Sequence, residues 1–464
     1  MTVIDLAVTG GTVVTGAGEK SADVLIRDEK IVAIVPAGEH HSAAKVIDAA
    51  GKIVLPGGID VHTHFLVGFM SRRSVYDMFS GSVAALRGGT TTIIDFALQR
   101  KGRSLMDGLR HRRTQADPYV AVDYGLHIVV TDVNDTTLAE IPAVVAAGVT
   151  SFKAYMTYEK EGLMLDDGAL LAILKAAGQE RVLVGVHAEN EKIIAYETAH
   201  RLAKGEISPR FHALTRPPIA EAEAIRRAMS LAEAAGAGIY IFHMAIGREI
   251  PNLRAARARG LRVFAETCPH YLVLDDTSYE RADGQLYVMS PPLRTPEDQA
   301  HLWAGLADGT VVAVGSDDAS FSAEAKTTDA DSFATTVNGV HGVEFRLPLL
   351  YTFGVEKGKL TLPQLVKVWS EGPARLFGLA PQKGSITPGG DADLVIIDPA
   401  RTTRLNIKSH FGPLRYNIYD GMEVRGVPVC TIRRGRVVVD NGEFLGAAGE
   451  GRFVKRMLPE LAHS

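Results

Sequence analysis

Two patterns of hydrophobic and polar positions divide the chain. Near the start, short Val/Ile-rich runs are separated by Gly, Asp and Lys turns, as in DLAVTGGTVV and ADVLIRDEKIVAIVPAG. Such runs are typical of β-strands. The same pattern returns near the end of the chain, in DADLVIIDP and VPVCTIRRGRVVVDNGEFL. Between these two regions, Ala-rich stretches end in glycine and are followed by continuous apolar runs. Glycine suits the left-handed residue that ends a helix, and a continuous apolar run suits a strand buried on both faces.

The middle of the chain repeats this helix–glycine–strand unit. Six such units are LRGGTTTIIDF, VAAGVTSFKAYM, KAAGQERVLVGVHAEN, EAAGAGIYIFHM, RARGLRVFAETCPH and LADGTVVAVGSDD. The apolar runs of KIVLPGGIDVHTH and VAVDYGLHIVVTD bring the number of expected strands to about eight. Strands that alternate with helices predict a parallel sheet, and about eight of them predict a closed (β/α)₈ barrel. We therefore predict an α/β fold with a barrel over residues 57–384. A smaller β-sandwich domain would be built from residues 1–56 and 385–464.

Reactive side chains stand at the ends of several apolar runs. His62 and His64 are two residues apart, so on a strand their imidazoles point to the same face. His187 and His243 end two other runs, and Asp317 ends the eighth. A single histidine in such a place is more often a structural residue. Four of them at the carboxyl face of a barrel, where active sites are built, indicate a metal site. Neutral imidazole favours zinc or a similar first-row ion.

Two further residues have more than one interpretation. Asp317 can bind a metal and accept a proton from water, although this segment also offers Asp318 and Ser320 as helix caps. Lys153 lies in the apolar run SFKAYM, and an ammonium group has no lone pair for a metal. It is either a lysine that extends to solvent or a lysine converted to a carbamate, which is an anionic bridging ligand. The residues alone leave these two readings open.

Composition narrows the class of protein. The chain has 464 residues, 46% of them hydrophobic, and a formal net charge of -4, which gives no reason to expect nucleic acid or an anionic membrane as a partner. No apolar run approaches the roughly 20 residues that span a bilayer. The first residues lack the basic and apolar regions of a secretory signal. Cys268 and Cys430 are the only cysteines and form no C-x-x-C motif. These features predict a cytoplasmic enzyme and nothing more specific.

Motifs along nearly the whole chain carry a family resemblance. They include PGGIDVHTHF, GGTTTIIDF, GVTSFKAYMTY, VGVHAEN, RPPIAEAEAI, CPHYL, VMSPPLR, GSDD, VNGVHGVEFR, KGSITPGGDADLVIIDP and DGMEVRGVPV. The chain resembles the cyclic amidohydrolases, specifically the dihydropyrimidinase and hydantoinase branch of the amidohydrolase superfamily. The most specific motif is the lysine of SFKAYMTY with a tyrosine five positions later. The resemblance implies a (β/α)₈ barrel with a composite β-sandwich, and commonly a homotetramer.

The resemblance also implies a centre of two divalent metal ions, usually zinc. The ligands that it implies are His62, His64, Lys153, His187, His243 and Asp317. The first two histidines and Asp317 would bind one metal, and the other two histidines would bind the second. Carbamylated Lys153 would bridge both.

The implied reaction is hydrolytic opening of a hydantoin or dihydropyrimidine ring to an N-carbamoyl amino acid. Asp317 would be the catalytic proton shuttle, and Tyr158 would hydrogen-bond the developing oxyanion. The main chain at Ser290 and Asn338 would hold the ring amide of the substrate. The segments 157–163 and 65–70 are expected to form loops over the pocket. Phe65, Leu66 and Phe69 would then be apolar walls, or else buried packing residues.

One position departs from the family pattern. Asp318 follows Asp317 where this branch usually has histidine. Neighbouring strand residues point to opposite faces, so Asp318 need not touch the metals. If the backbone turns there, a second carboxylate could raise the pKa of Asp317 or alter the pocket.

Three alternatives remain beside the ring hydrolase. An allantoinase or another cyclic ureide or imide hydrolase shares the same chemistry. A non-catalytic scaffold relative should have lost ligands, and here all six are present. A mononuclear, deaminase-like enzyme is disfavoured by Lys153 in its strand. Metal content would separate these classes, with about two ions per chain for the ring hydrolases, about one for the deaminase and none for the scaffold.

Overall fold

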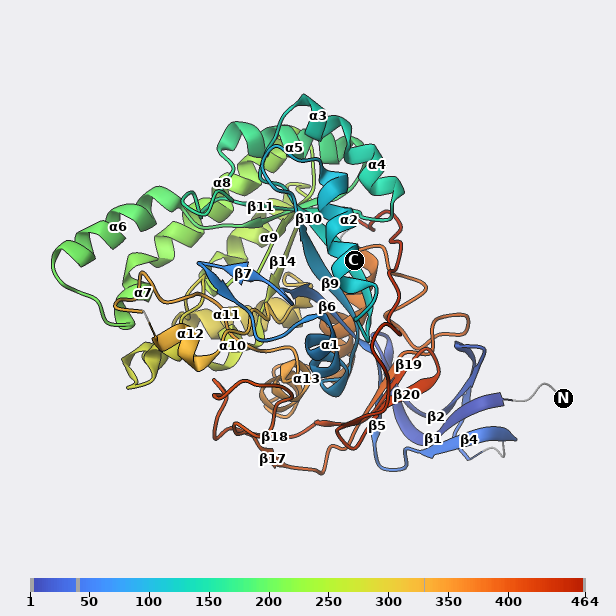
Figure 1. The fold of residues 1–464 in the computed structure, drawn as a ribbon. Helices are drawn as coiled ribbons and strands as arrows, with labels where there is room; N and C mark the ends of the chain where they lie inside the picture. Colours follow the sequence, from blue (N-terminus) through green and yellow to red (C-terminus); the bar gives the residue numbers. More distant parts are fainter. Residues whose placement is uncertain (1–3, 39–41, 329, 462–464) are drawn as a thin grey trace.

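The barrel predicted from the apolar runs is confirmed. The computed structural model describes residues 4–38, 42–328 and 330–461. Within these residues, eight parallel strands form one sheet in the order β15-β14-β13-β12-β11-β10-β9-β6 (Figure 1). Their bounds are β6 Gly58–Thr63, β9 Thr90–Leu98, β10 Asp123–Val129, β11 Ser151–Tyr155, β12 Leu183–His187, β13 Ile239–Ile241, β14 Val263–Thr267 and β15 Ala313–Val314.

The first and last strands meet and close the barrel. Thr63 in β6 forms a parallel bridge with Asp318, just beyond β15. The backbone N–H of His64 donates to the carbonyl of Asp318 at 2.9 Å. Closure therefore brings the two ends of the apolar pattern, the His62–His64 pair and the acidic segment, next to each other.

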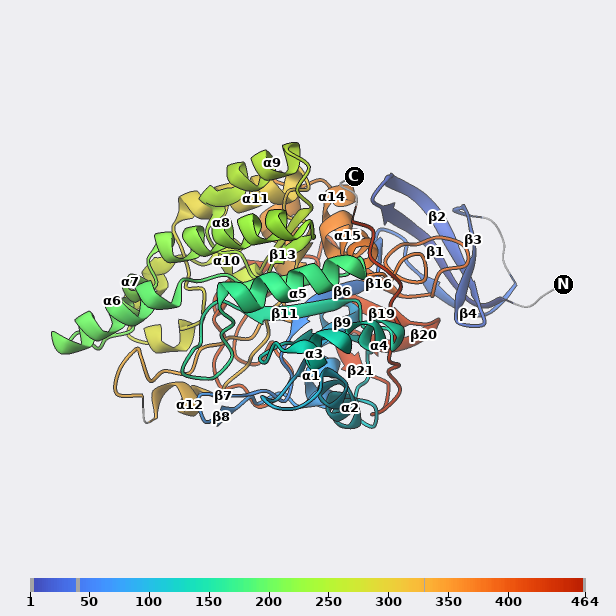
Figure 2. The ribbon, with the colours of Figure 1, turned by 90° about the horizontal axis from the view of Figure 1, so that it is seen from above.

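Helices surround these strands, as Figures 1 and 2 show. The α-helices are α1 Met78–Arg87, α2 Leu105–Ala116, α3 Asp135–Ala139, α4 Ile141–Ala146, α5 Asp167–Gln179, α6 Glu191–Ala203, α7 Arg210–Thr215, α8 Pro218–Ala235, α9 Ile250–Ala258, α10 Pro269–Val273, α11 Pro296–Ala307, α12 Ala323–Thr327, α13 Arg346–Leu350, α14 Leu362–Val366 and α15 Gly372–Leu376. Short 3₁₀ segments are η1 Gly247–Glu249, η2 Asp276–Glu280 and η3 Gly284–Tyr287, and π-helical turns are η4 Tyr351–Val355 and η5 Lys367–Glu371. None of the helices described is long and apolar enough to cross a membrane.

A second, mixed sheet combines both ends of the chain, as the sequence predicts. In the described residues it has nine strands in the order β21-β20-β19-β16-β5-β1-β2-β3, with β4 beside β1. The bounds are β1 Ile4–Thr15, β2 Gly18–Arg27, β3 Lys30–Pro36, β4 Ala43–Asp48, β5 Ile53–Pro56, β16 Leu394–Ile397, β19 Pro428–Arg433, β20 Arg436–Asp440 and β21 Glu443–Phe444. Antiparallel pairing of β5 with β16 joins the two terminal segments. The exact domain boundaries, after residue 56 and before residue 385, stay a prediction.

Two small sheets complete the strands. One is a hairpin of β7 Gly68–Phe69 with β8 Arg72–Arg73; the other is a two-stranded antiparallel sheet in which β17 Thr403–Arg404 pairs with β18 Glu423–Val424 across a long connection.

Aromatic rings occupy much of the barrel interior. Phe96, Phe242 and Phe264 pack there with other buried apolar side chains. A Cβ at Gly185 would collide with the Phe242 ring, and one at Gly58 would collide with Trp369. Glycine at these positions therefore lets the rings occupy the core at close-packed density.

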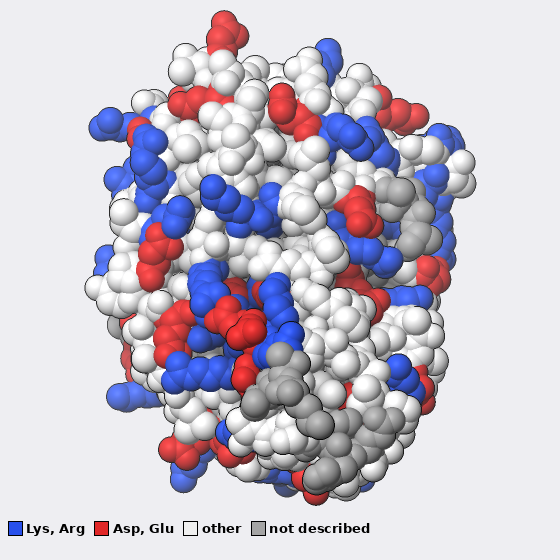
Figure 3. All heavy atoms as spheres, turned by 90° about the vertical axis from the view of Figure 1, so that its right-hand side faces the viewer, with Lys and Arg blue, Asp and Glu red and all other residues white. Residues whose placement is uncertain are grey.

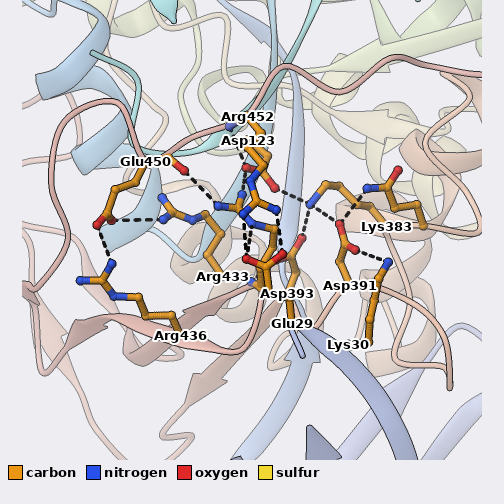
Figure 4. A network of polar contacts seen from close by, with 12 residues as sticks. Glu29, Lys30, Asp123, Lys383, Asp391, Asp393, Arg433, Arg436, Glu450 and Arg452 are labelled. Carbon is orange, nitrogen blue, oxygen red and sulfur yellow. Dashed lines mark hydrogen bonds and ion pairs between the residues drawn. The ribbon is translucent and has the colours of Figure 1, made fainter. Parts of the chain in front are cut away.

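A buried polar network joins the terminal sheet to the foot of the barrel (Figure 4). The Lys383 ammonium lies 2.7 Å from carboxylate oxygens of Asp123 and Asp393 and 2.9 Å from Asp391. Asp123 begins β10, so its carboxylate marks the amino end of the barrel, opposite the catalytic face of such folds. Arg434 also pairs with Asp123. Figure 3 faces this end of the molecule, where basic and acidic side chains lie together in a dense group.

Candidate active site

The strands of the barrel carry the predicted ligands at their carboxyl ends. His62 lies in β6, and His64 directly follows that strand. Lys153 lies in β11, and His187 is the last residue of β12. These strands are neighbours or face one another around the barrel, so residues far apart in sequence converge on one edge.

The last two predicted ligands lie just beyond their strands rather than at the final strand residue. β13 ends at Ile241 and β15 at Val314, so His243 and Asp317 stand two and three residues further on. Both have left-handed backbones, with φ of 37° and 48°. Such conformations are uncommon for residues other than glycine and cluster at functional sites. Here they aim both side chains into the barrel mouth.

Three ligand atoms converge on one point. The Nε2 atoms of His62 and His64 are 3.1 Å apart. Oδ1 of Asp317 lies 3.0 Å from the first and 3.2 Å from the second. A second histidine pair, His187 and His243, lies beside this group. The centres of their rings are 4.4 Å apart, and the ring centre of His243 is 5.2 Å from that of His62. Imidazole nitrogen with a carboxylate oxygen is a donor set that suits a divalent metal ion.

Lys153 lies inside this group of donors. It is 1% exposed, and its Nζ has no hydrogen-bond partner in the described part of the chain. The amine stands 3.9 Å from the centre of the Phe242 ring. Burial lowers the pKa of Lys153 to about 7, against the opposing effect of Asp317 and Glu266. A buried amine without a partner is costly unless something else at the site satisfies it. This fits a lysine whose nitrogen belongs to a metal-binding group.

Glu266, at the end of β14, organises the histidines and was not predicted. Its carboxylate accepts from Nδ1 of His62 in a short hydrogen bond. It also accepts from the backbone N–H of His243 at 3.1 Å and from the Tyr240 hydroxyl at 2.9 Å. A carboxylate can only accept, so Nδ1 of His62 carries the proton and Nε2 keeps its lone pair for a metal. An acidic residue in the apolar run VFAETCPH was the available signal.

Glu189 has the corresponding role at His187. Its Oε2 lies 2.7 Å from Nε2 of His187 and 2.6 Å from Nη1 of Arg216. This contact occupies Nε2, so Nδ1 is the nitrogen of His187 that could bind a metal. The Arg216 guanidinium also lies 5.7 Å from the centre of the Tyr158 ring. A single buried ion pair therefore links a predicted ligand to the predicted oxyanion donor.

All of the predicted site residues except His62, which is fully buried behind His64 and Asp317, line one cavity of about 610 Å³. Its lining includes His64, Lys153, Tyr158, His187, His243, Ser290, Asp317 and Asn338. Leu66 and Phe69 also line it, from the expected loop after the first histidine pair, and Leu163 lines it from the loop 157–163. Phe65 does not: it is fully buried against Gly81 and is a packing residue.

Tyr158 is held rigidly at the rim of the site. Its backbone is left-handed, with φ of 65°, and its N–H donates to Glu191 at 2.9 Å. Burial raises the pKa of Tyr158 to about 12, while Arg216 and the side chains of Ser290 and Asn338 act in the other direction. The hydroxyl is therefore protonated at neutral pH and available as a donor.

Asp318 points away from the donor group. Its carboxylate accepts from the N–H groups of Gly342 at 2.9 Å and Val343 at 3.1 Å, and from the Ser320 hydroxyl at 2.5 Å. Burial raises the pKa of Asp318 to about 6. The pKa of Asp317 is nevertheless held well below its usual range, because His62 and His64 outweigh its burial. Asp318 thus fixes the following loop and does not raise the pKa of Asp317.

Comparison with known proteins agrees with this fold and site. The model of the amidohydrolase family matches residues 53–438, and the chain belongs to that family. Within it, the chain belongs to the hydantoinase and dihydropyrimidinase branch, because its full-length relatives carry those names.

Individual relatives match over nearly the whole length of both proteins. A D-hydantoinase from Geobacillus stearothermophilus is 42% identical over 97% of this chain and 96% of its own. A D-phenylhydantoinase from Escherichia coli K12 is 40% identical over 97% of each. The crystal structure of a dihydropyrimidinase from Brevibacillus agri has a TM-score of 0.95 at 42% identity, covering 98% of this chain and 99% of that one. An L-hydantoinase from Arthrobacter aurescens has a TM-score of 0.91 at 33% identity, covering 98% and 100%.

Proposed function

We propose that this chain is a metal-dependent hydrolase that opens the ring of a hydantoin or dihydropyrimidine to give an N-carbamoyl amino acid. The observation that carries the proposal is the convergence of His64, His187, His243, Asp317 and an unpartnered, buried Lys153 at one cavity, with His62 in contact with His64 and Asp317 directly behind the cavity wall. The full-length similarity to proteins named D-hydantoinase, D-phenylhydantoinase and dihydropyrimidinase supports the choice of substrate class.

We further propose that the donors hold two divalent ions, of which zinc is the expected one. His62, His64 and Asp317 form one donor set, and His187 and His243 form the other. Lys153, as a carbamate, would supply the anion between them. When bound, such ions act as Lewis acids that polarise a carbonyl group and lower the pKa of coordinated water.

The side chains of the chain itself would then have distinct roles. Asp317 is a carboxylate at neutral pH, so it can take a proton from the attacking water and return it to the leaving ring nitrogen. The protonated Tyr158 hydroxyl would donate to the oxygen that develops negative charge on the attacked carbonyl. The main chain at Ser290 and Asn338 would hold the ring amide.

The side chains that line the cavity limit which substituents a substrate ring can carry. Leu66, Phe69 and Leu163 are apolar, which favours an uncharged, apolar substituent over the polar ureido group of allantoin. A cytoplasmic location and a tetrameric assembly stay predictions from the sequence and its resemblance.

A hydrolysis panel tests this function. Purified protein with measured zinc content would be given hydantoin, both enantiomers of 5-phenyl- and 5-alkyl-hydantoins, dihydrouracil, allantoin and a simple cyclic imide. We expect about two metal ions per chain and fastest turnover of a hydantoin or of dihydrouracil. The Asp317→Asn variant serves as the matched control for contaminating activity. Preferential turnover of allantoin would favour the allantoinase alternative, and a fully metallated protein that opens none of these rings would refute the proposal.

A further inference from the structure

Lys326 is a buried lysine that the proposed reaction does not use. It lies in α12 and its side chain is fully buried. Among the described residues, no carboxylate lies within ion-pair distance of its ammonium. Burial accordingly lowers the pKa of Lys326 to about 7. Lysine is rarely buried completely unless it is paired, so this side chain must satisfy another requirement of the fold.

The Lys326 side chain joins two loop segments that are distant in sequence. Its Nζ donates to the carbonyl of Val288 at 2.8 Å and to the carbonyl of Val337 at 3.1 Å. The N–H of Gly339 donates to the same Val288 carbonyl at 3.1 Å. The segments 288–290 and 337–339 are thus held at a fixed separation by one amine and one backbone hydrogen bond. Hydrogen bonds from a charged donor are stronger than neutral ones, and a neutral amine still offers two N–H groups for the two carbonyls.

These two segments carry the residues proposed to bind the substrate ring. Ser290 lies two residues after Val288, and Asn338 directly follows Val337. Both Ser290 and Asn338 line the cavity, and their side chains interact with Tyr158. Lys326 itself is absent from the cavity lining, so it stands behind this wall.

We propose that Lys326 is a positioning residue that sets the distance between the two main-chain partners of the substrate ring amide. The inference rests on the proposed function, because it assigns the ring amide to Ser290 and Asn338. Its effect reaches the substrate only through those segments. A change at Lys326 should therefore alter substrate binding while leaving the predicted metal ligands, which lie on or just after barrel strands, in place.

Steady-state kinetics of matched variants test the role. Lys326→Met keeps the length and apolar stem but removes the donors, whereas Lys326→Gln keeps an NH₂ group on a shorter stem. Thr327→Val changes an exposed neighbour on the same helix and is the control. We expect Lys326→Met to raise KM by about tenfold to hundredfold, with a smaller change in kcat and unchanged metal content. Lys326→Gln should lie between it and the wild type, and Thr327→Val should match the wild type. An unchanged KM in Lys326→Met, or loss of its metal, would overturn the proposal.

Amide hydrogen exchange supplies a readout that does not depend on turnover. In Lys326→Met, peptides that contain Val288 and Gly339 should exchange faster than in the wild type and in Thr327→Val. Unaltered exchange would overturn the positioning role even in an active enzyme. If the wild type opened no cyclic amide while exchange still accelerated, the proposed function would fail and the link between the two segments would stand.

Discussion

Replacing Lys383 with methionine would leave three buried carboxylates without their shared cation. Lys383 is 1% exposed, and its partners Asp123, Asp391 and Asp393 are at most 5% exposed. Methionine preserves most of the side-chain volume, so the substitution removes mainly the charge. Because the network joins the terminal sheet to the foot of the barrel, we expect a loss of stability and little change in kcat.

The expected loss of stability can be estimated from the burial of Lys383 and its partners. Removing one partner of a buried ion pair costs about 3–5 kcal/mol, because the remaining charge loses its compensation. Asp123 keeps Arg434 and Asp391 keeps Lys30, so among the described residues it is Asp393 that would be left without a side-chain cation. Unfolding entropy is roughly 2.1 cal/mol/K per residue, so in a chain of 464 residues that unfolds as one unit this cost lowers Tm by roughly 3–5 °C. Lys30→Met is the matched control: Lys30 pairs with the same Asp391 at 2.6 Å but is 43% exposed. An exposed pair contributes about 0–1 kcal/mol.

Thermal unfolding followed by circular dichroism across a pH series would measure the difference in Tm between Lys383→Met and Lys30→Met. Burial raises the pKa of Asp123 and of Asp391, but Lys383, together with Arg434 at Asp123 and Lys30 at Asp391, outweighs it and lowers both pKa values. Groups with lowered folded pKa values stabilise the fold above their unfolded pKa, and this stabilisation is lost as the pH falls through the folded value. The deficit of Lys383→Met should therefore be largest at neutral pH and shrink as the pH falls below about 4. A Tm within one degree of Lys30→Met at pH 7 would refute the reasoning.

The remaining predictions concern the site. Lys153→Ala should lose bound metal and activity together, because the bridging anion is missing; full activity would contradict the carbamate assignment. Asp317→Asn should keep the circular-dichroism spectrum of the wild type but abolish turnover, and an active variant would exclude it as the proton shuttle. Tyr158→Phe should lower kcat by about 10²–10³ with a smaller effect on KM, as expected on losing one oxyanion donor; a change confined to KM would argue against that role. Glu266→Gln should weaken metal affinity about 10–100-fold, measured by competition with a chelator, because His62 loses its carboxylate partner. An unchanged metal affinity would show that Glu266 does not orient the ligand.

The barrel and its donors could be predicted because the determining signals are local. Six of the eight strands are apolar runs that follow an Ala-rich stretch and a glycine, and each run ends at the same face of the sheet. His62, His64, His187 and His243 therefore converge once eight strands are recognised. The sequence left open whether Asp318 points away from the donor group or turns towards Asp317. Hydrogen bonds from Gly342 and Val343 hold its carboxylate away from the donor group.

Other features of the site depend on contacts between segments that are distant in sequence, and the pattern of apolar runs does not show which segments meet. Glu266 and Glu189 hold His62 and His187 through contacts with residues of other strands and helices. An acidic residue in or beside an apolar run indicates only that some polar partner exists, and not which residue it is. His and Asp enter the left-handed region more often than most residues, but it is uncommon even for them, so the left-handed turns at His243 and Asp317 could not be predicted from residue type alone. Phe65 is buried because Gly81 of α1 leaves room for its ring, which no local pattern reveals.

The pairing of β5 with β16 has a consequence for how the protein is made. Val54 pairs with Ile396, about 340 residues later in the chain. At a synthesis rate of about 5–20 residues per second, the edge of β5 waits roughly 20–70 seconds on the ribosome before its partner exists. An unpaired strand edge is a site for association with other chains, so the nascent protein is most exposed to misassembly during this interval. Chaperone demand should accordingly fall sharply once residues 394–397 have left the exit tunnel.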